Sequence, residues 1–309
     1  MLKYLIVQLD DTSPSFCHYH NSRQNRRLIP IDNLRKALVW AMKENLMVQF
    51  VYPDYSLPKE YLELIDTVDH IDIEHDNQDA DVSVFTGTES FVILKEKKYP
   101  NVVLRLSKSE LFNYVDDILT ILKNQPSLNI VITDIESFND EDFDVYKRVL
   151  EELAQTVIDK LKINATTNLN LLTNRLLLDA MNNCNAGDDS ITIAPDGNFY
   201  ICPAFYLEGM DNVGNPIDGV SIPNQRLYKL DYAPICKTCD AYQCKRCTWL
   251  NQKLTGEVNT PGREQCIIAH LERNASRELL EIIKTSGMIK TDKLIPEIDY
   301  LDPFEKITH

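Results

Sequence analysis

Cysteines are the residues of this sequence with the most evident chemistry, and seven of the eight lie between residues 184 and 266. The seven are Cys184, Cys202, Cys236, Cys239, Cys244, Cys247 and Cys266. Thiolates hold zinc or iron–sulfur clusters, and in oxidising compartments cysteines form disulfides instead. The first nine residues are too short, and end in too acidic a segment, for a secretory signal. The clustering therefore favours metal binding over disulfides.

The spacing of the central cysteines distinguishes a zinc site from an iron–sulfur site. They form the string Cys236-x2-Cys239-x4-Cys244-x2-Cys247. Zinc ribbons usually place about a dozen or more residues between two such pairs, so both pairs can hardly wrap one zinc ion. Short gaps are typical of iron–sulfur ligation, in which neighbouring cysteines can serve different clusters. Zinc remains the alternative.

The complete pattern resembles the SPASM domain, the auxiliary iron–sulfur module of radical SAM peptide and protein maturases. It reads Cys184-x12-Gly197-x4-Cys202, then the four-cysteine string, then Cys266. The string is slightly shorter than the common form of that domain. The resemblance implies two 4Fe–4S clusters. The first would be held by Cys236, Cys239, Cys244 and Cys266, and the second by Cys184, Cys202 and Cys247. One iron corner of the second cluster is then open, or is bound by an oxygen ligand or a substrate thiol.

The N-terminal loop departs from the radical SAM pattern. Enzymes of that class bind their reactive cluster through Cys-x3-Cys-x2-Cys after the first strand. Here the matching positions are Ser13, Cys17 and His20. One thiolate cannot form that site, so no residues that bind S-adenosylmethionine are expected. Cys17 and His20 are candidates for metal or nucleophilic chemistry, and a surface loop with incidental histidines is the plainer alternative.

A degenerate radical SAM core joined to a SPASM-like module is similar to the CXXX repeat peptide maturases of Bacteroidales. The resemblance implies a part in the maturation of a ribosomally synthesised cysteine-repeat (CXXX) peptide, without SAM radical chemistry. The implied partners are the precursor peptide and a companion modification protein. Two alternatives stay open: a non-catalytic partner that binds the precursor while its clusters are structural, and a zinc-stabilised interaction protein. Whether the chain is catalytic also stays open.

Strands and helices alternate through the first 181 residues. The expected strands are 4–9, 47–52, 70–74, 82–85, 102–106, 129–133 and 163–167, and the expected helices are 32–44, 58–67, 109–123, 140–161 and 171–181. This order favours parallel strands with right-handed crossovers. About six such units predict an α/β fold, a partial (β/α)6 TIM-like barrel of radical SAM type. A doubly wound sheet is the alternative, and both place chemistry at the carboxyl ends of the strands.

The distribution of glycine indicates where the second part begins. Gly87 is the only glycine in the sequence before residue 187, and the other eight lie between residues 187 and 287. No Gly-rich dinucleotide or phosphate loop is therefore expected in the first half. We predict a core over residues 1–181, a SPASM-like domain over 182–286 and a tail over 287–309. Within the second part, residues 191–201 predict a β-hairpin and 266–284 a helix.

Charge and hydropathy exclude two classes of partner. The chain carries 32 basic and 47 acidic residues, for a net charge of −15. It therefore lacks the basic surface that nucleic acids require. No apolar run approaches the roughly 18–20 residues that span a bilayer. We predict a cytoplasmic protein with no nucleic-acid or membrane partner.

Overall fold

The computed structural model describes residues 2–289 and 291–297. It divides into two units, each built from two separate stretches of the chain. The first unit is Met1–Val84 with Asn185–Ala233, and the second is Phe85–Cys184 with Pro234–His309. Both units thus contain residues from either side of the predicted boundary at 181. The three predicted domains remain a prediction, and part of the predicted tail (290 and 298–309) lies outside the described residues.

A sheet of mostly parallel strands forms the core of the first unit. The strand order is β3-β2-β1-β8, with β9 antiparallel beside β8 and the start of β4 parallel beside β3. The strands are β1 (Tyr4–Gln8), β2 (Met47–Val51), β3 (His70–His75), β4 (Val82–Thr86), β8 (Ser190–Ile193), β9 (Phe199–Tyr200), β10 (Gly214–Asn215) and β11 (Gly219–Val220). The helices are α1 (Ile31–Lys43), α2 (Lys59–Ile65), α8 (Pro203–Leu207), η3 (Gln225–Tyr228) and η4 (Leu230–Tyr232).

Apolar spacing explains why β1 and α1 form. Leu5 and Val7 alternate along β1 and are fully buried. Leu34 and Leu38 belong to the apolar stripe of α1, which repeats every three or four residues. The predicted hairpin at 191–201 is confirmed as β8 and β9. Its first strand also pairs in parallel with β1, so this part of the cysteine-rich segment completes the sheet of the first unit.

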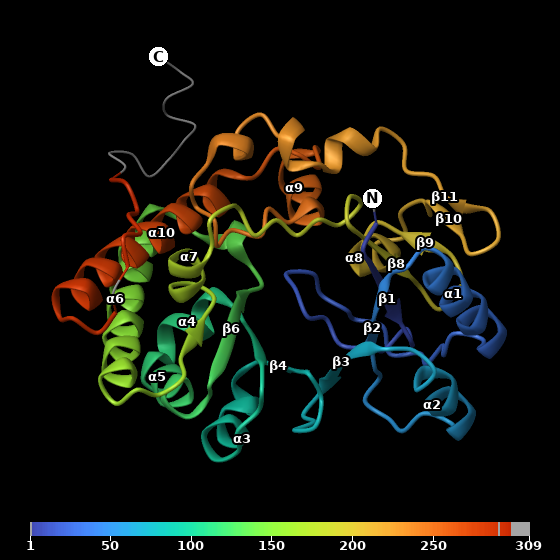
Figure 1. Ribbon diagram of the computed structural model, residues 1–309, viewed down its shortest axis with the longest axis horizontal. Helices are drawn as coiled ribbons and strands as arrows, with labels where there is room; N and C mark the ends of the chain where they lie inside the picture. The colour runs from blue at the N-terminus through green and yellow to red at the C-terminus, as the bar shows by residue number, and fades with distance from the viewer. Residues whose placement is uncertain (1, 290, 298–309) are drawn as a thin grey trace. The chain divides into compact units, whose positions relative to one another are not determined.

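Parallel strands also form the core of the second unit, in the order β5-β6-β7. Figure 1 shows these strands with their helices. The strands are β5 (Val102–Leu106), β6 (Ser127–Ile132) and β7 (Asn168–Leu169). The helices are η1 (Thr88–Ser90), α3 (Phe91–Glu96), α4 (Lys108–Asn113), α5 (Val115–Asn124), η2 (Ile135–Ser137), α6 (Asp140–Lys162), α7 (Thr173–Leu177), η5 (Cys236–Thr238), α9 (Thr248–Thr255) and α10 (Arg263–Thr285).

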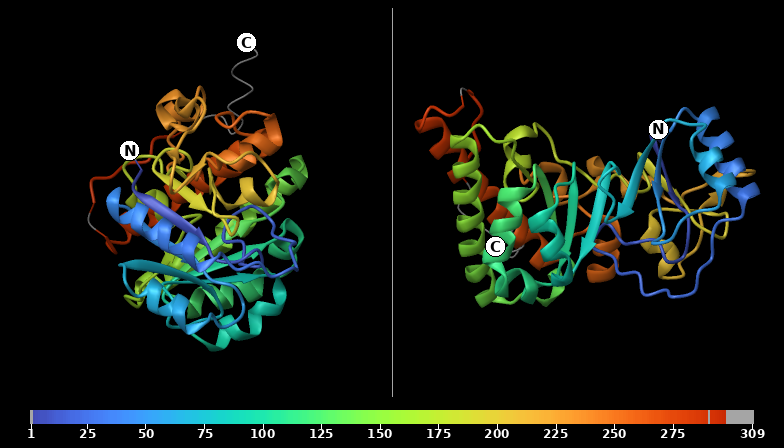
Figure 2. Two further views of the ribbon diagram at one scale, coloured as in Figure 1. Left: turned by 90° about the vertical axis from the view of Figure 1, so that its right-hand side faces the viewer. Right: turned by 90° about the horizontal axis from the view of Figure 1, so that it is seen from below.

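The two longest helices, α6 and α10, pack against each other in the second unit. Figure 2 shows α10, in red, beside α6, in light green. Helix α6 begins with a capping box, in which the Asn139 side chain accepts from the Asp142 N–H and the Asp142 carboxylate accepts from the Asn139 N–H. Such a start fixes the register of the helix, and thus which of its residues face α10.

The α/β class with mainly parallel strands is confirmed, and three of the expected elements differ from the structure. The helix expected at 109–123 is two helices, because the backbone leaves the helical region at Tyr114 (φ −123°, ψ 35°). The strand expected at 163–167 is wrong: Asn164 adopts a left-handed conformation (φ 55°) after α6, and pairing begins only at β7. The helix expected at 171–181 is limited to α7, since Leu178 is extended.

No helix in the described part of the chain combines the length and the hydropathy that crossing a membrane requires.

The packing of α1 can be tested with two variants of one helix. Leu38 is 2% exposed and Met42 is 65% exposed. We expect Leu38→Ala to lower the free energy of unfolding by about 2–5 kcal/mol, because it leaves a cavity under the sheet. Met42→Ala should change it by less than about 0.5 kcal/mol. Urea denaturation followed by circular dichroism measures both, and equal losses in the two variants would show that α1 is not packed as described.

Candidate functional site

A cavity in the second unit is lined by four of the predicted ligands. Cys236, Cys239, Cys244 and Cys266 border a space of about 220 Å³, here called the cysteine cavity. These are the four residues that the resemblance to the SPASM domain assigns to the first cluster. Thr238, Arg246, Gln265 and His270 are the polar residues of its wall besides the cysteines. A single set of thiols therefore converges on one space, although the chain separates its first and last members by 29 residues.

Short turns bring three of these cysteines together. Cys236 starts the 3-10 turn η5, and its carbonyl accepts the Cys239 N–H at 3.1 Å. The Cys244 N–H donates in the same way to the Ala241 carbonyl at 3.0 Å. Cys266 comes from the first turn of α10. The turns at 236–239 and 241–244 therefore bring Cys236, Cys239 and Cys244 to the wall of one cavity.

Backbone N–H groups point at two of the sulfurs. The Ala241 N–H donates to Cys239 Sγ, and the Arg246 N–H donates to Cys244 Sγ, both at 3.4 Å. Such N–H···S bonds stabilise a thiolate and are one of the features that set the reduction potential of iron–sulfur clusters. These two bonds therefore favour the thiolate form of Cys239 and Cys244.

Burial acts against that charged form when no cation is present. It raises the pKa of Cys236 to about 11 and that of Cys244 to about 12. The charge of Arg246 opposes the effect at Cys236, and the Ala241 N–H opposes the rise at Cys239. A bound metal group would supply the missing positive charge and release the protons.

Two further groups near the cavity were not predicted. The Nε2 atom of His270 lies 3.6 Å from Cys239 Sγ, and His270 is 3% exposed. Glu272 accepts from the Tyr146 hydroxyl at 2.8 Å, and burial raises its pKa to about 7. Because Cys266 and His270 are four residues apart on α10, their helical spacing is the signal that could have placed His270 beside the cysteines.

The remaining predicted ligands are divided between the two units. Cys184 belongs to the second unit, where its N–H donates to the Lys245 carbonyl at 2.6 Å, within the four-cysteine string. Cys247 is in the same unit at the start of α9 and is buried. Cys202 belongs to the first unit and precedes α8. The second set of ligands therefore remains a prediction.

Sites for a single metal ion require three or more ligands around one point. Within residues 2–289 and 291–297, no group of three or more His, Cys, Asp or Glu side chains is arranged to hold a metal ion.

The loop after β1 is fixed by hydrogen bonds at the position expected for the first cysteine of a radical SAM motif. Ser13 is buried, and its hydroxyl donates to the Val51 carbonyl at 2.8 Å and accepts from the Asp10 N–H at 3.2 Å. Cys17 is half-buried and His20 is exposed. Ser13 thus acts as a structural residue of the loop.

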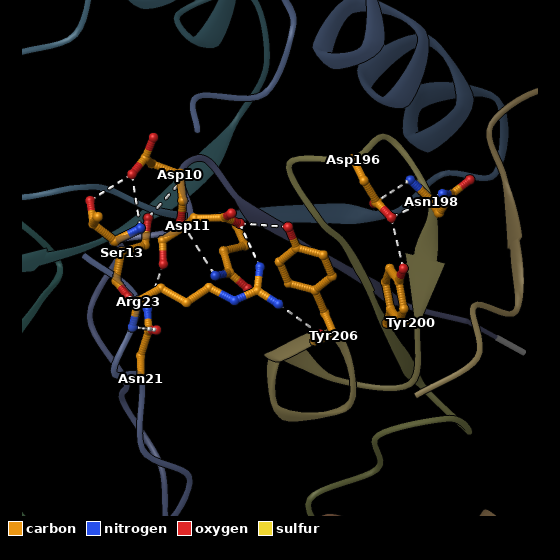
Figure 3. Close-up of polar contacts among 11 residues, drawn as sticks. Asp10, Asp11, Ser13, Asn21, Arg23, Asp196, Asn198, Tyr200 and Tyr206 are labelled. Atoms are coloured by element: carbon orange, nitrogen blue, oxygen red, sulfur yellow. Dashed lines mark hydrogen bonds and ion pairs between the residues drawn. The ribbon is translucent and has the colours of Figure 1, made fainter. Parts of the chain in front are cut away.

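A buried polar cluster then joins this loop to α8 within the first unit (Figure 3). The Tyr206 hydroxyl donates to Asp11 Oδ1 at 2.5 Å, and Arg23 Nη1 donates to the same oxygen at 2.9 Å. The guanidinium of Arg23 also lies over the Tyr206 ring, 4.2 Å from its centroid. Burial, followed by the hydrogen bond to Asp11, raises the pKa of Tyr206 to about 12. No sequence pattern indicated this cluster, since its members are up to 195 residues apart.

Comparison with solved structures shows which fold this is. A histidine-tagged protein described as "anSMEcpe with bound AdoMet" is similar with a TM-score of 0.60 and 13% sequence identity, over 92% of this chain and 100% of that one. SuiB of Streptococcus suis bound to S-adenosylmethionine gives a TM-score of 0.44 at 12% identity, over 86% of this chain and 75% of that one. SuiB bound to the precursor peptide SuiA gives a TM-score of 0.43 at 12% identity, over 86% of this chain and 76% of that one.

Comparisons with protein-family models and with curated proteins gave no match. The first structural likeness establishes the α/β fold of radical SAM type for this chain.

The buried thiols make the stability of the metal-free protein depend on pH. Their folded pKa values are raised above the ordinary value of 9.0. Their stabilising contribution is therefore fully present below about pH 9 and is lost as the pH rises towards 11–12, by up to about 1.4 kcal/mol per pH unit for each thiol.

Denaturation of the metal-free protein between pH 8 and about 11 measures this loss, with Cys236→Ala/Cys244→Ala as the variant that should lose less. Cys17→Ala is the control and should behave like the wild type. The explanation fails if all three proteins show the same pH dependence.

The Asp11 cluster can be tested at its tyrosine. We expect Tyr206→Phe to destabilise the protein by about 1.5–3 kcal/mol, because a buried carboxylate loses a donor. Tyr200→Phe is the matched control, since its hydroxyl bonds to Asp196 rather than Asp11 and its loss should leave the N-terminal loop unchanged. Limited proteolysis between Asp11 and Arg23 gives the readout: faster cleavage is expected in Tyr206→Phe, and an unchanged rate would contradict the role of the cluster.

Proposed function

We propose that this chain is an iron–sulfur protein that takes part in the post-translational maturation of a ribosomally synthesised cysteine-repeat peptide. The observation that carries the proposal is the convergence of Cys236, Cys239, Cys244 and Cys266 on one cavity. These residues would hold a 4Fe–4S cluster, a group that accepts and donates single electrons.

The cavity fits a cluster better than a single ion. Its volume of about 220 Å³ exceeds by an order of magnitude the roughly 10–15 Å³ that one water molecule needs, and an ion is of comparable size. Thiols around a cluster also lie farther apart than thiols around one ion, because iron and sulfide atoms stand between them. The N–H···S bonds to Cys239 and Cys244 match the surroundings of such a group.

A second 4Fe–4S cluster on Cys184, Cys202 and Cys247 completes the proposal, with one corner that is open or bound by a non-cysteine ligand. Asp188 and Asp189 follow Cys184, where some relatives in the SPASM group carry a further cysteine. Asp189 is paired with Lys3 at 2.6 Å and Asp188 with Lys229 at 3.5 Å. These pairings favour an open corner or a substrate thiol over a carboxylate ligand.

The N-terminal loop supports a role without SAM radical chemistry. Its single cysteine, Cys17, cannot replace the three thiolates of a radical SAM site, and Ser13 is committed to hydrogen bonds within the loop. Cys17 and His20 remain candidates for a catalytic part. The same observations favour a second candidate function, in which the chain binds the precursor peptide for a companion modification protein.

Iron and acid-labile sulfide measure the cluster content directly. After anaerobic reconstitution we expect about eight irons and eight sulfides per chain, as two 4Fe–4S clusters require. Cys239→Ala should lose about half of both, because it removes a ligand of one cluster. Cys17→Ala is the control and should keep the full content. Stoichiometric zinc without sulfide would contradict the proposal.

One experiment with a synthetic peptide distinguishes a catalytic role in maturation from a role in binding the precursor. A synthetic leader-containing peptide with Cys-x-x-x repeats is incubated anaerobically with the loaded protein and a one-electron reductant. A change in the mass of the peptide supports catalysis, and binding without a change in mass supports the binding role. The absence of both binding and mass change overturns the peptide part of the proposal.

A further inference from the structure

Gln265 is a buried polar residue in the wall of the cysteine cavity. It is 6% exposed, and its side-chain oxygen Oε1 is buried with no hydrogen-bond partner among the described residues. Burying an amide without a hydrogen bond is unfavourable, so nearly all buried polar atoms of folded proteins have a partner. A ligand bound in the cavity would give Gln265 the partner that the protein does not supply.

Gln265 shares one face of α10 with a proposed cluster ligand, Cys266. The cavity is bordered by positions 265, 266, 269 and 270 of this helix, which lie on one side of it because a turn takes 3.6 residues. Gln265 is also the third residue of α10, where a glutamine often accepts the N–H of the residue before the helix. Here Oε1 does not accept the Gly262 N–H. The side chain is therefore not used to cap the helix.

The chemistry of a carboxamide indicates what kind of group could be its partner. One end of a carboxamide is an acceptor and the other is a donor, and a half-turn about its last bond exchanges them. The sulfide and thiolate sulfurs of a 4Fe–4S cluster are acceptors of N–H groups. A single metal ion held by the same thiolates adds no acceptor of its own. The Gln265 carboxamide is thus suited to a cluster in the cavity.

We infer that Gln265 contacts the cluster bound by Cys236, Cys239, Cys244 and Cys266, and that its carboxamide donates an N–H to a sulfur of that cluster. The inference rests on the proposed function. On reduction, one electron passes from a one-electron donor to the cluster, and no bond is formed or broken. An N–H···S bond stabilises the added negative charge, so Gln265 raises the reduction potential. It acts in addition to the backbone N–H donors at Cys239 and Cys244.

One variant and a matched control test the contact. Gln265→Met removes the carboxamide and keeps an unbranched side chain of similar size. Gln252→Met makes the same change on α9 of the same unit, at a glutamine that is not in the cavity wall and donates to the Gly256 carbonyl at 3.0 Å. Both are made in the full-length Cys202→Ser parent, which lacks a ligand of the second proposed cluster.

The first measurement is urea denaturation of the metal-free parent and of metal-free Gln265→Met. We expect the midpoint of the variant to be equal or higher, because an apolar side chain replaces a buried amide without a partner. A lower midpoint, or a variant that does not fold, overturns the inference alone, because the amide would then be needed within the protein itself.

The second measurement is a redox titration of the reconstituted proteins with dithionite, followed by electron paramagnetic resonance. At a fixed potential, we expect the ratio of reduced to oxidised cluster to fall about tenfold in Gln265→Met, which is about 59 mV for one electron. Gln252→Met should titrate like the parent.

The remaining outcomes are also decisive. Loss of iron and sulfide from Gln265→Met, with both retained in Gln252→Met, supports the contact. An unchanged content and potential in Gln265→Met, or equal changes in the two variants, overturn the inference alone. A parent protein without iron and sulfide overturns the proposed function, and the inference with it.

Discussion

The burial of several thiols around one space is the constraint on which the second unit depends. A desolvated thiol resists ionisation, as the raised pKa values of Cys236 and Cys244 show. The surrounding protein nevertheless supplies groups that favour the charged form: two backbone N–H donors and the guanidinium of Arg246. Burial keeps these thiols neutral in the metal-free protein, and a bound iron–sulfide core would favour the thiolate form. The proposed 4Fe–4S cluster would balance these opposing effects on the thiols.

In the first unit, side-chain hydrogen bonds fix the loop at the carboxyl end of the first strand. In this loop after β1, where the resemblance to radical SAM enzymes implies a cluster site, side chains supply the bonds. Asp11 is bonded by both Arg23 and Tyr206, and Ser13 is bonded to the backbone of β2. These bonds replace the order that a metal cluster would impose on such a loop. The order of this loop is thus explained by its own side chains.

Much of the fold could be predicted from the sequence, because it depends on local periodicity. The short apolar run at residues 102–106 predicted β5 with its correct bounds, and the apolar stripe of α6 predicted that helix to within one residue. The errors come from single backbone conformations, at Tyr114 and Asn164, that periodicity does not report. The convergence of Cys236 with Cys266 agrees with the sequence motif. Arg246 and His270 were not predicted, since their proximity to the sulfurs arises from tertiary packing.

Anomalous X-ray diffraction from crystals of the anaerobically loaded protein tests the central claim most directly. Data collected on either side of the iron absorption edge should show a strong peak among the sulfurs of Cys236, Cys239, Cys244 and Cys266. A peak there at the zinc edge alone, or four thiols with no anomalous scatterer between them, would contradict the account.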